Sequence, residues 1–194
     1  MKTKPILAWA IETVTFIFAM FGGFLTAIAP PGEADARFAV GISSFLMLIV
    51  LLFISVFTQG RLKKKHKKIW LAVAVIGFIV GAASAFSYKW NLDRLTFGYP
   101  PESPETTYVA GTELTEEASN YLARHSGLPT SQLVAKFEGP ENREVVWTAA
   151  SIRKSKMILS VNYISLVLSL ASTIFCLTEG LIVKPANQRS KGTP

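Results

Sequence analysis

Apolar residues in this chain are gathered into four long blocks separated by polar segments. Each block is long enough for a helix of roughly 20 residues, which is the length that crosses the hydrocarbon core of a bilayer. A soluble fold would distribute its apolar residues at period 2 or 3.6 among charged ones. The pattern therefore predicts an all-α membrane protein with four transmembrane helices. The four blocks cover residues 5–29, 38–58, 69–88 and 157–183.

The first block has some features of a secretory signal peptide. Lys2 and Lys4 precede it, and Ala27-Ile28-Ala29 resembles a cleavage site with small residues. The apolar stretch is longer than a typical signal core, however, and Pro30 stands where cleavage needs an ordinary residue. We therefore expect this block to be retained as the first span.

The distribution of Lys and Arg predicts the orientation of the spans. Of the 20 Lys and Arg residues, 11 lie in the N-terminal segment, in the loop 61–68 and in the tail 184–194. Cytoplasmic segments are the ones that carry such an excess. Both termini and the loop are therefore expected in the cytoplasm, and residues 89–156 outside it. Arg153, Lys154 and Lys156 lie just outside the fourth span and weaken this assignment.

The predicted organisation has four parts. Residues 1–88 hold the first three spans, 89–156 form a small, mainly helical extracytoplasmic domain, 157–183 form the fourth span, and 184–194 form a basic tail. The single cysteine, Cys176, permits no intramolecular disulfide. An outer domain without disulfides favours a bacterial inner membrane over a eukaryotic secretory context.

Capping residues divide the polar domain into elements. Thr115 is expected to cap a helix that runs to about Ser126, because Glu116 and Glu117 follow it in the first turn. A second helix is expected over 131–138, an extended stretch over 144–147, and a connector without regular structure over 98–106. Thr148 is expected to cap a helix of more than 30 residues that continues into the fourth span.

Nothing in the sequence predicts an enzyme. The only histidines are His66 and His125, and the common motifs for nucleophilic catalysis, phosphate loops, dinucleotides and zinc are missing. We expect no cofactor and no metal site. Clustered carboxylates at Glu113, Glu116 and Glu117 are typical of a solvated helix start.

Two of the spans carry a stripe of polar or small residues at heptad spacing, and a third carries small residues. In the fourth span the stripe has spacings of 3 and 4 and therefore follows one helix face. It consists of Asn162, Ser165, Ser169, Ser172, Cys176 and Glu179. The first span repeats the spacing and includes Glu12 and Gly22, and the third has the pair Gly77 and Gly81. The second span is apolar on all sides and is expected to face lipid.

The stripes have two interpretations. Small residues let membrane helices approach closely, and Ser or Thr can form hydrogen bonds between helices. The same face could instead line a water-filled pore in an oligomer. Glu12 and Glu179 are the strongest candidates for a functional role, because an intramembrane carboxylate is costly unless it faces water or a partner. They could form acidic rings, or they could reach the interface and pair with lysines.

The loop between the second and third spans is strongly basic and too short to fold. Its cations are Arg61, Lys63, Lys64, Lys65, Lys67 and Lys68. They are expected to anchor the chain to anionic lipid on the cytoplasmic side. An acidic protein partner or nucleic acid could also dock here. Aromatic residues near the expected interfaces are interpreted as interfacial belts. They are Trp9, Trp70, Tyr88, Trp90 and Tyr163.

In size, span count and basic cytoplasmic face, the chain resembles the small four-span membrane subunits of bacterial antiphage defence systems, such as the Kiwa-type membrane subunit. The resemblance covers the whole chain, involves no specific motif and assigns no residue a role. It implies a homo-oligomer that senses infection at the membrane and acts through a soluble cytoplasmic effector. Two other functions remain open: an oligomeric ion channel that depolarises the membrane, and an accessory subunit of a transporter or envelope complex.

Overall fold

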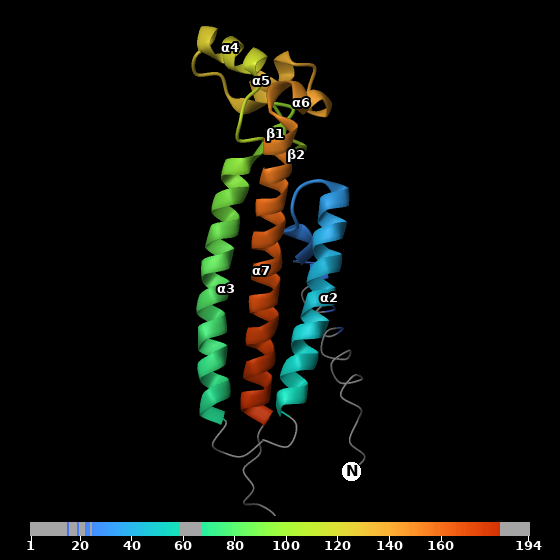
Figure 1. Cartoon of the computed structure of the whole chain (residues 1–194), viewed down its shortest axis with the longest axis vertical. Helices are drawn as coiled ribbons and strands as arrows, with labels where there is room; N and C mark the ends of the chain where they lie inside the picture. Colours follow the sequence, from blue (N-terminus) through green and yellow to red (C-terminus); the bar gives the residue numbers. More distant parts are fainter. Residues whose placement is uncertain (1–14, 16–18, 20–21, 24, 59–66, 183–194) are drawn as a thin grey trace, which may run out of the picture.

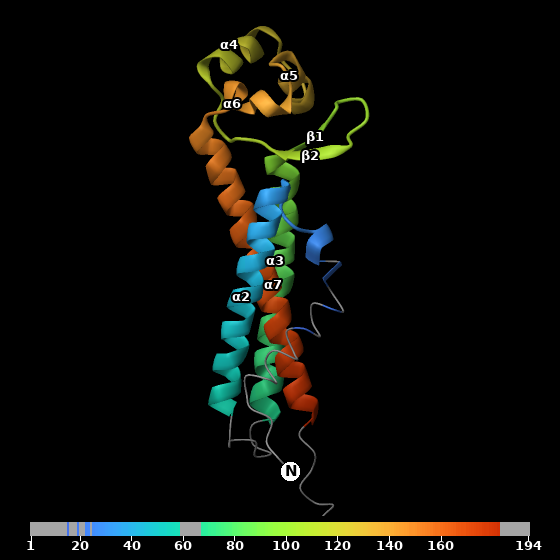
Figure 2. The same ribbon diagram turned by 90° about the vertical axis from the view of Figure 1, so that its right-hand side faces the viewer.

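The computed structural model describes residues 15, 19, 22–23, 25–58 and 67–182 of the chain. These residues form two parts, a shaft of long helices and a compact polar head at one end of it (Figures 1 and 2). The first predicted span falls mostly outside the described residues, and so do the loop 59–66 and the tail 183–194.

Three helices of the shaft are long and apolar enough to cross a membrane. They are α2 (Glu33–Thr58), α3 (Lys67–Leu95) and α7 (Ala149–Ile182). Helix α7 lies between the other two and contacts both (Figure 1). At a rise of about 1.5 Å per residue α7 is about 50 Å long, which exceeds a hydrocarbon core of about 30 Å. The prediction of one helix of more than 30 residues that enters the last span is confirmed.

Helix α2 is not lipid-facing on all sides, so the prediction for the second span was wrong on this point. Residues at a spacing of four are buried along its face toward α7, whereas Phe38, Phe45 and Phe53 on other faces are exposed. A uniformly apolar sequence cannot show which side meets a neighbouring helix, because lipid and protein offer similar apolar surroundings. The buried residues are Ala39, Ser43, Met47 and Leu51.

The head consists of a β-hairpin and short helices. Strands β1 (Thr96–Tyr99) and β2 (Thr106–Val109) pair in antiparallel fashion, with Thr96 opposite Val109. The helical elements are α4 (Glu116–Arg124), α5 (Thr130–Lys136), the short 3₁₀ helix η2 (Pro140–Asn142) and α6 (Arg143–Val146).

Two local predictions for the head were wrong in part. Residues 100–105 of the expected connector have no regular structure, but its two ends belong to strands β1 and β2, because Phe97 stacks on Tyr108 and both strands join the head core. The expected extended stretch 144–147 is mostly helix α6, and only Trp147 is extended, in a bridge with Leu114. In both places contacts with residues distant in sequence outweigh the local preference.

Local capping signals were reliable. Thr115 caps α4, and its hydroxyl accepts a hydrogen bond from the amide of Ala118 at 3.3 Å. The second head helix, expected from Ser131, is α5, and Gly139 follows it with a φ of 93°, a conformation that favours glycine. Such signals work because the cap and the amides it satisfies are within four residues of each other.

Candidate functional site

The first turn of α7 is held by the segment of the head that precedes α4. The amide of Thr148 donates to the carbonyl of Glu113 at 3.0 Å, and the Ser151 hydroxyl donates to the same carbonyl at 3.3 Å. Gly111 lies so close that an added Cβ would come within 2.5 Å of the Trp147 Cβ. The segment before α4 and the start of α7 are therefore in direct contact.

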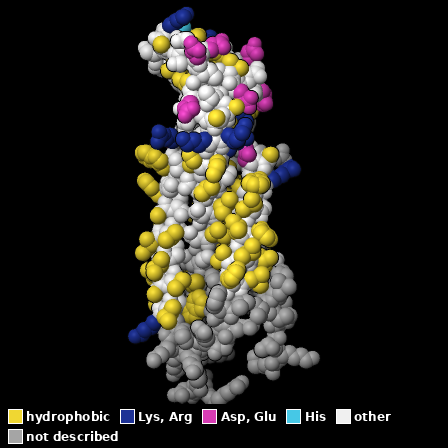
Figure 3. Space-filling model, in the orientation of Figure 1, with side chains coloured by type: hydrophobic (Ala, Val, Ile, Leu, Met, Phe, Trp, Pro, Cys, Tyr) yellow, Lys and Arg dark blue, Asp and Glu magenta, His cyan; other side chains and the backbone are white. Residues whose placement is uncertain are grey.

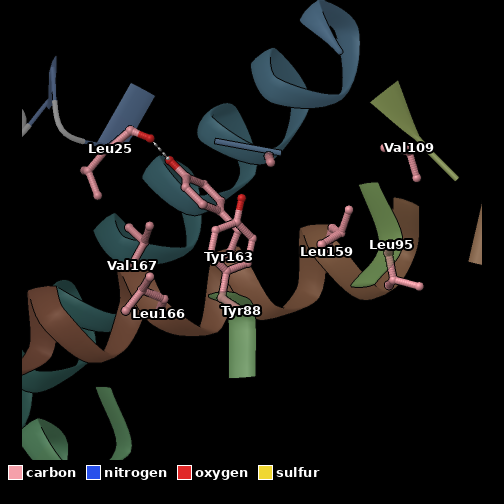
Figure 4. Packing of buried hydrophobic residues seen from close by; sticks show 9 residues of the cluster. Leu25, Tyr88, Leu95, Val109, Leu159, Tyr163, Leu166 and Val167 are labelled. Carbon is pink, nitrogen blue, oxygen red and sulfur yellow. Dashed lines mark hydrogen bonds between the residues drawn. The ribbon is translucent and has the colours of Figure 1, made fainter. Parts of the chain in front are cut away.

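Two tyrosines form the centre of the shaft below the head. Tyr88 on α3 and Tyr163 on α7 are 4% and 0% exposed, and their ring centroids are 6.1 Å apart. The Tyr163 hydroxyl donates to the carbonyl of Leu25 at 3.0 Å (Figure 4). The Tyr88 hydroxyl donates to the carbonyl of Ile28 at 2.5 Å. Carbonyls in the last turn of a helix lack a partner within that helix. The two tyrosines therefore fix the end of the N-terminal segment to α3 and α7.

This placement corrects the interpretation of both tyrosines as interfacial belt residues. Belt side chains face lipid headgroups, whereas Tyr88 and Tyr163 face one another and the segment 25–29. Trp90, at 62% exposed, is accessible in the way a belt residue must be. Sequence analysis missed the tyrosines because a tyrosine near the end of an apolar helix has the same local signature in either role.

Replacing Tyr163 with Phe is expected to loosen the N-terminal segment. The change removes only the hydroxyl, and a hydrogen bond between membrane helices contributes on average about 0.6 kcal/mol and at most about 1.7 kcal/mol. Amide hydrogen exchange in residues 25–29 should therefore accelerate about 3- to 20-fold. The control is Tyr108→Phe, since the Tyr108 hydroxyl has no hydrogen bond within the described part of the chain. Unchanged exchange in Tyr163→Phe would show that the tyrosine does not hold this segment.

One ion pair joins α2 to α7 at the same level. The Lys156 ammonium lies 2.8 Å from the Asp35 carboxylate, and both side chains are about 30% exposed. Because both groups retain access to solvent, the pair contributes little to stability. The pair nevertheless connects the start of α2 to the part of α7 nearest the head.

Some residues of the polar stripe of α7 contact α3, and others are exposed on the surface. The Asn162 amide oxygen accepts a hydrogen bond from the Ser87 hydroxyl at 3.3 Å, and Ser169 lies against Gly81. Ser165 is exposed, Ser172 is half-buried and Cys176 is buried. The hydroxyls of Ser169 and Thr173 donate to carbonyls of their own helix.

The glycines predicted to mediate helix packing lie where α3 meets α7. An added Cβ at Gly77 would be 2.6 Å from the Thr173 hydroxyl, and one at Gly81 would be 3.5 Å from the Ser169 Cβ. Gly22 lies in the N-terminal segment, where its carbonyl accepts a hydrogen bond from the Thr26 hydroxyl at 2.8 Å.

Several predicted site residues lie outside what the structure describes. They include Glu12 and the loop cations Arg61, Lys63, Lys64 and Lys65. Glu179 and Lys67 are in helices whose backbone is described there, but their side chains are not. Lys68 is described and is exposed at the end of α3 opposite the head.

No group of three or more His, Cys, Asp and Glu side chains that could hold a metal ion occurs among the described residues. His125 stacks on Tyr121, with ring centroids 4.3 Å apart, and its ring nitrogen is 3.1 Å from the carbonyl of the same residue. The junction formed by the start of α7, the two tyrosines and the segment 25–29 can fix one helix relative to another. We therefore take it as the candidate functional site.

No protein-family model, curated protein or solved structure matches this chain.

Proposed function

We propose that this chain is the membrane subunit of a bacterial antiphage defence system, acting as a homo-oligomeric sensor and adaptor in the cytoplasmic membrane. The chain crosses the membrane four times, with both termini and the loop 61–68 in the cytoplasm and the head outside. A change at the envelope alters the head, and α7 conveys the change to a soluble effector docked on the basic cytoplasmic face.

The observation that carries this proposal is the continuity of α7. Its 34 residues run without a break from the head to the opposite end of the shaft. The carbonyl of Glu113 fixes its first turn, and the pair of Tyr88 and Tyr163 holds its middle. A helix held at both levels moves as one body, which is what conveying a change across a membrane requires.

The distribution of charge supports the proposed orientation. The outer segment 89–156 contains eight Lys or Arg residues against nine Asp or Glu residues. The segments 1–4, 61–68 and 184–194 contain eleven Lys or Arg residues and no Asp or Glu. An excess of Lys and Arg marks the cytoplasmic side. The contacts of Asn162 and Ser169 with α3 favour helix packing over pore lining for these two residues.

A hinge introduced into α7 should abolish the function. Four glycines inserted between Lys156 and Met157 cost the helix about 4 kcal/mol and uncouple the head from the shaft. Cells carrying the chain with its neighbouring genes should lose resistance to phage, and the native mass of the extracted complex should stay the same. The control is the same insertion between Glu102 and Ser103 in the hairpin turn, which should keep resistance. Resistance that survives the hinge would contradict coupling through α7.

The adaptor role requires a bound effector, which native mass measurement of the gently extracted complex tests. A soluble protein in fixed stoichiometry should be present, and it should be lost when the five lysines of the basic loop are changed to Gln. A matched control changes Lys184, Arg189 and Lys191 of the tail. A homo-oligomer that carries no other protein and conducts ions would instead identify a channel.

A further inference from the structure

A band of cationic side chains lies between the apolar shaft and the acidic head on the face shown in Figure 3. We call it the basic collar, and its members are Arg37, Lys89, Arg94, Arg153, Lys154 and Lys156. Lys89 pairs with Asp93 at 2.5 Å, and Lys156 pairs with Asp35 at 2.8 Å. Within the described residues, Arg94, Arg153 and Lys154 form no ion pair and no side-chain hydrogen bond. The collar therefore has unneutralised positive charge at the edge of the shaft.

A groove begins directly below one of these unpaired cations. It has a volume of about 390 Å³ and follows a single face of α7, because its residues recur at spacings of three and four. Met157 and Val161 form its walls and are 69% and 52% exposed. The complete lining is Lys154, Met157, Ile158, Val161 and Asn162.

Asn162 is the lining residue farthest from Lys154 along α7, and the surface that the groove exposes is almost entirely apolar. The Asn162 amide oxygen accepts the hydrogen bond from Ser87, and its amide NH₂ donates to no group in the described part of the chain. Asn162 is eight residues below Lys154, or about 12 Å along the helix.

The charged and apolar groups along the groove follow the same order as the groups that a bound phospholipid would need. A cation comes first, at the level of headgroups, and apolar walls follow toward the hydrocarbon. We propose that this groove is a binding site for one anionic phospholipid. The Lys154 ammonium holds the phosphate, Arg153 and Arg94 add to the local positive potential, and one acyl chain lies along Met157, Ile158 and Val161.

Charge decides between a lipid and a second copy of the chain as the occupant. Copies related by an axis along the membrane normal place the same residues at the same height. At the height of Lys154, a neighbouring copy would present a collar with six cations against three acids in the described part of the chain, which are Glu33, Asp35 and Asp93. Like charges in this region of reduced dielectric repel, whereas a phosphate is attracted. The inference rests on membrane placement and not on the sensing role.

Native mass spectrometry of the full-length chain tests the site. The protein is exchanged into mixed micelles that contain equal amounts of phosphatidylglycerol and phosphatidylcholine, and the retained lipids are counted. Phosphatidylglycerol should be retained in preference. Lys154→Gln should reduce its retention about fivefold, since each cation near a membrane surface contributes about that factor. The control is Lys136→Gln, an exposed lysine of the head, which should bind as the wild type does.

Two further experiments distinguish a bound lipid from other occupants of the groove. Val161→Trp fills the groove without a change of charge and should also reduce phosphatidylglycerol retention. Glycerol phosphate, which has the anionic group and no acyl chain, should not compete. The proposal is overturned if both lipids are retained equally, if Lys154→Gln behaves as Lys136→Gln does, or if glycerol phosphate competes. It is also overturned if Val161→Trp leaves lipid retention intact and instead splits an oligomer, because a second copy would then occupy the groove.

Discussion

Replacing Trp147 with alanine is expected to open the head while the shaft stays helical. Trp147 is 5% exposed, and its ring lies against Phe97 with centroids 5.6 Å apart. It belongs to the core that joins the hairpin, α4, α5 and the first turn of α7. Truncating a buried tryptophan removes apolar contacts and leaves a cavity, at a cost of about 3–5 kcal/mol. A small domain has little stability in reserve, so most of its folded population should be lost.

Limited proteolysis measures this effect directly. Arg124 and Lys136 are exposed trypsin sites within the head, and cleavage there follows the population of opened molecules when reclosing is fast. Cleavage in Trp147→Ala should accelerate about 100-fold or more. Trp90→Ala is the matched control, because Trp90 is 62% exposed at the end of α3 and its loss creates no cavity. Equal cleavage in the two variants would show that Trp147 does not hold the head together.

Replacing Gly77 with leucine is expected to force α3 away from α7. An added Cβ already meets the Thr173 hydroxyl at 2.6 Å, and the larger side chain would also meet the Thr173 backbone. Overpacking of this kind costs about 1–3 kcal/mol. The apparent melting temperature of the purified protein in detergent should fall by several degrees, as measured by loss of the monodisperse species after heating.

Gly41→Leu provides the matched control on α2. No heavy atom lies within 4 Å of an added Cβ at Gly41, so the same substitution meets open space there and should leave the melting temperature unchanged. Gly77→Ala gives a second test of the same contact. The added methyl group of Gly77→Ala would meet the Thr173 hydroxyl, and Thr173→Ala removes that hydroxyl. The double variant Gly77→Ala/Thr173→Ala should therefore recover stability, as a coupled pair does. A melting temperature for Gly77→Leu that equals that of Gly41→Leu would contradict close packing at this crossing.

Some features of the site could be predicted because their causes are local. Thr115 and Thr148 mark the starts of α4 and α7, since a cap satisfies amides within its own first turn. The length of α7 follows from the absence of a glycine or proline between Ala149 and Thr178. Glycines in the third span were expected to face another helix, and Gly77 and Gly81 meet α7.

Other features depend on pairs of residues far apart in sequence. Tyr163 donates to Leu25 across 138 residues, and Tyr88 donates to Ile28 across 60. No periodicity distinguishes such a tyrosine from one that faces lipid headgroups. In the head, the pairing of Thr96 with Val109 makes strands of the residues on both sides of the proline-containing turn 100–105.

The sequence by itself determined the apolar blocks, the caps and the excess of basic residues at one end, because hydropathy, capping and charge act along the chain or on a few neighbours. The tertiary structure alone decided which face of α2 is buried and where an apolar groove lies below Lys154. It also decided that Tyr88 and Tyr163 are buried between helices and do not face lipid headgroups. The physical reason is that apolar residues are favourable against both lipid and protein, so composition places a helix in a membrane without choosing its neighbours. Only close packing and hydrogen bonds between distant segments make that choice.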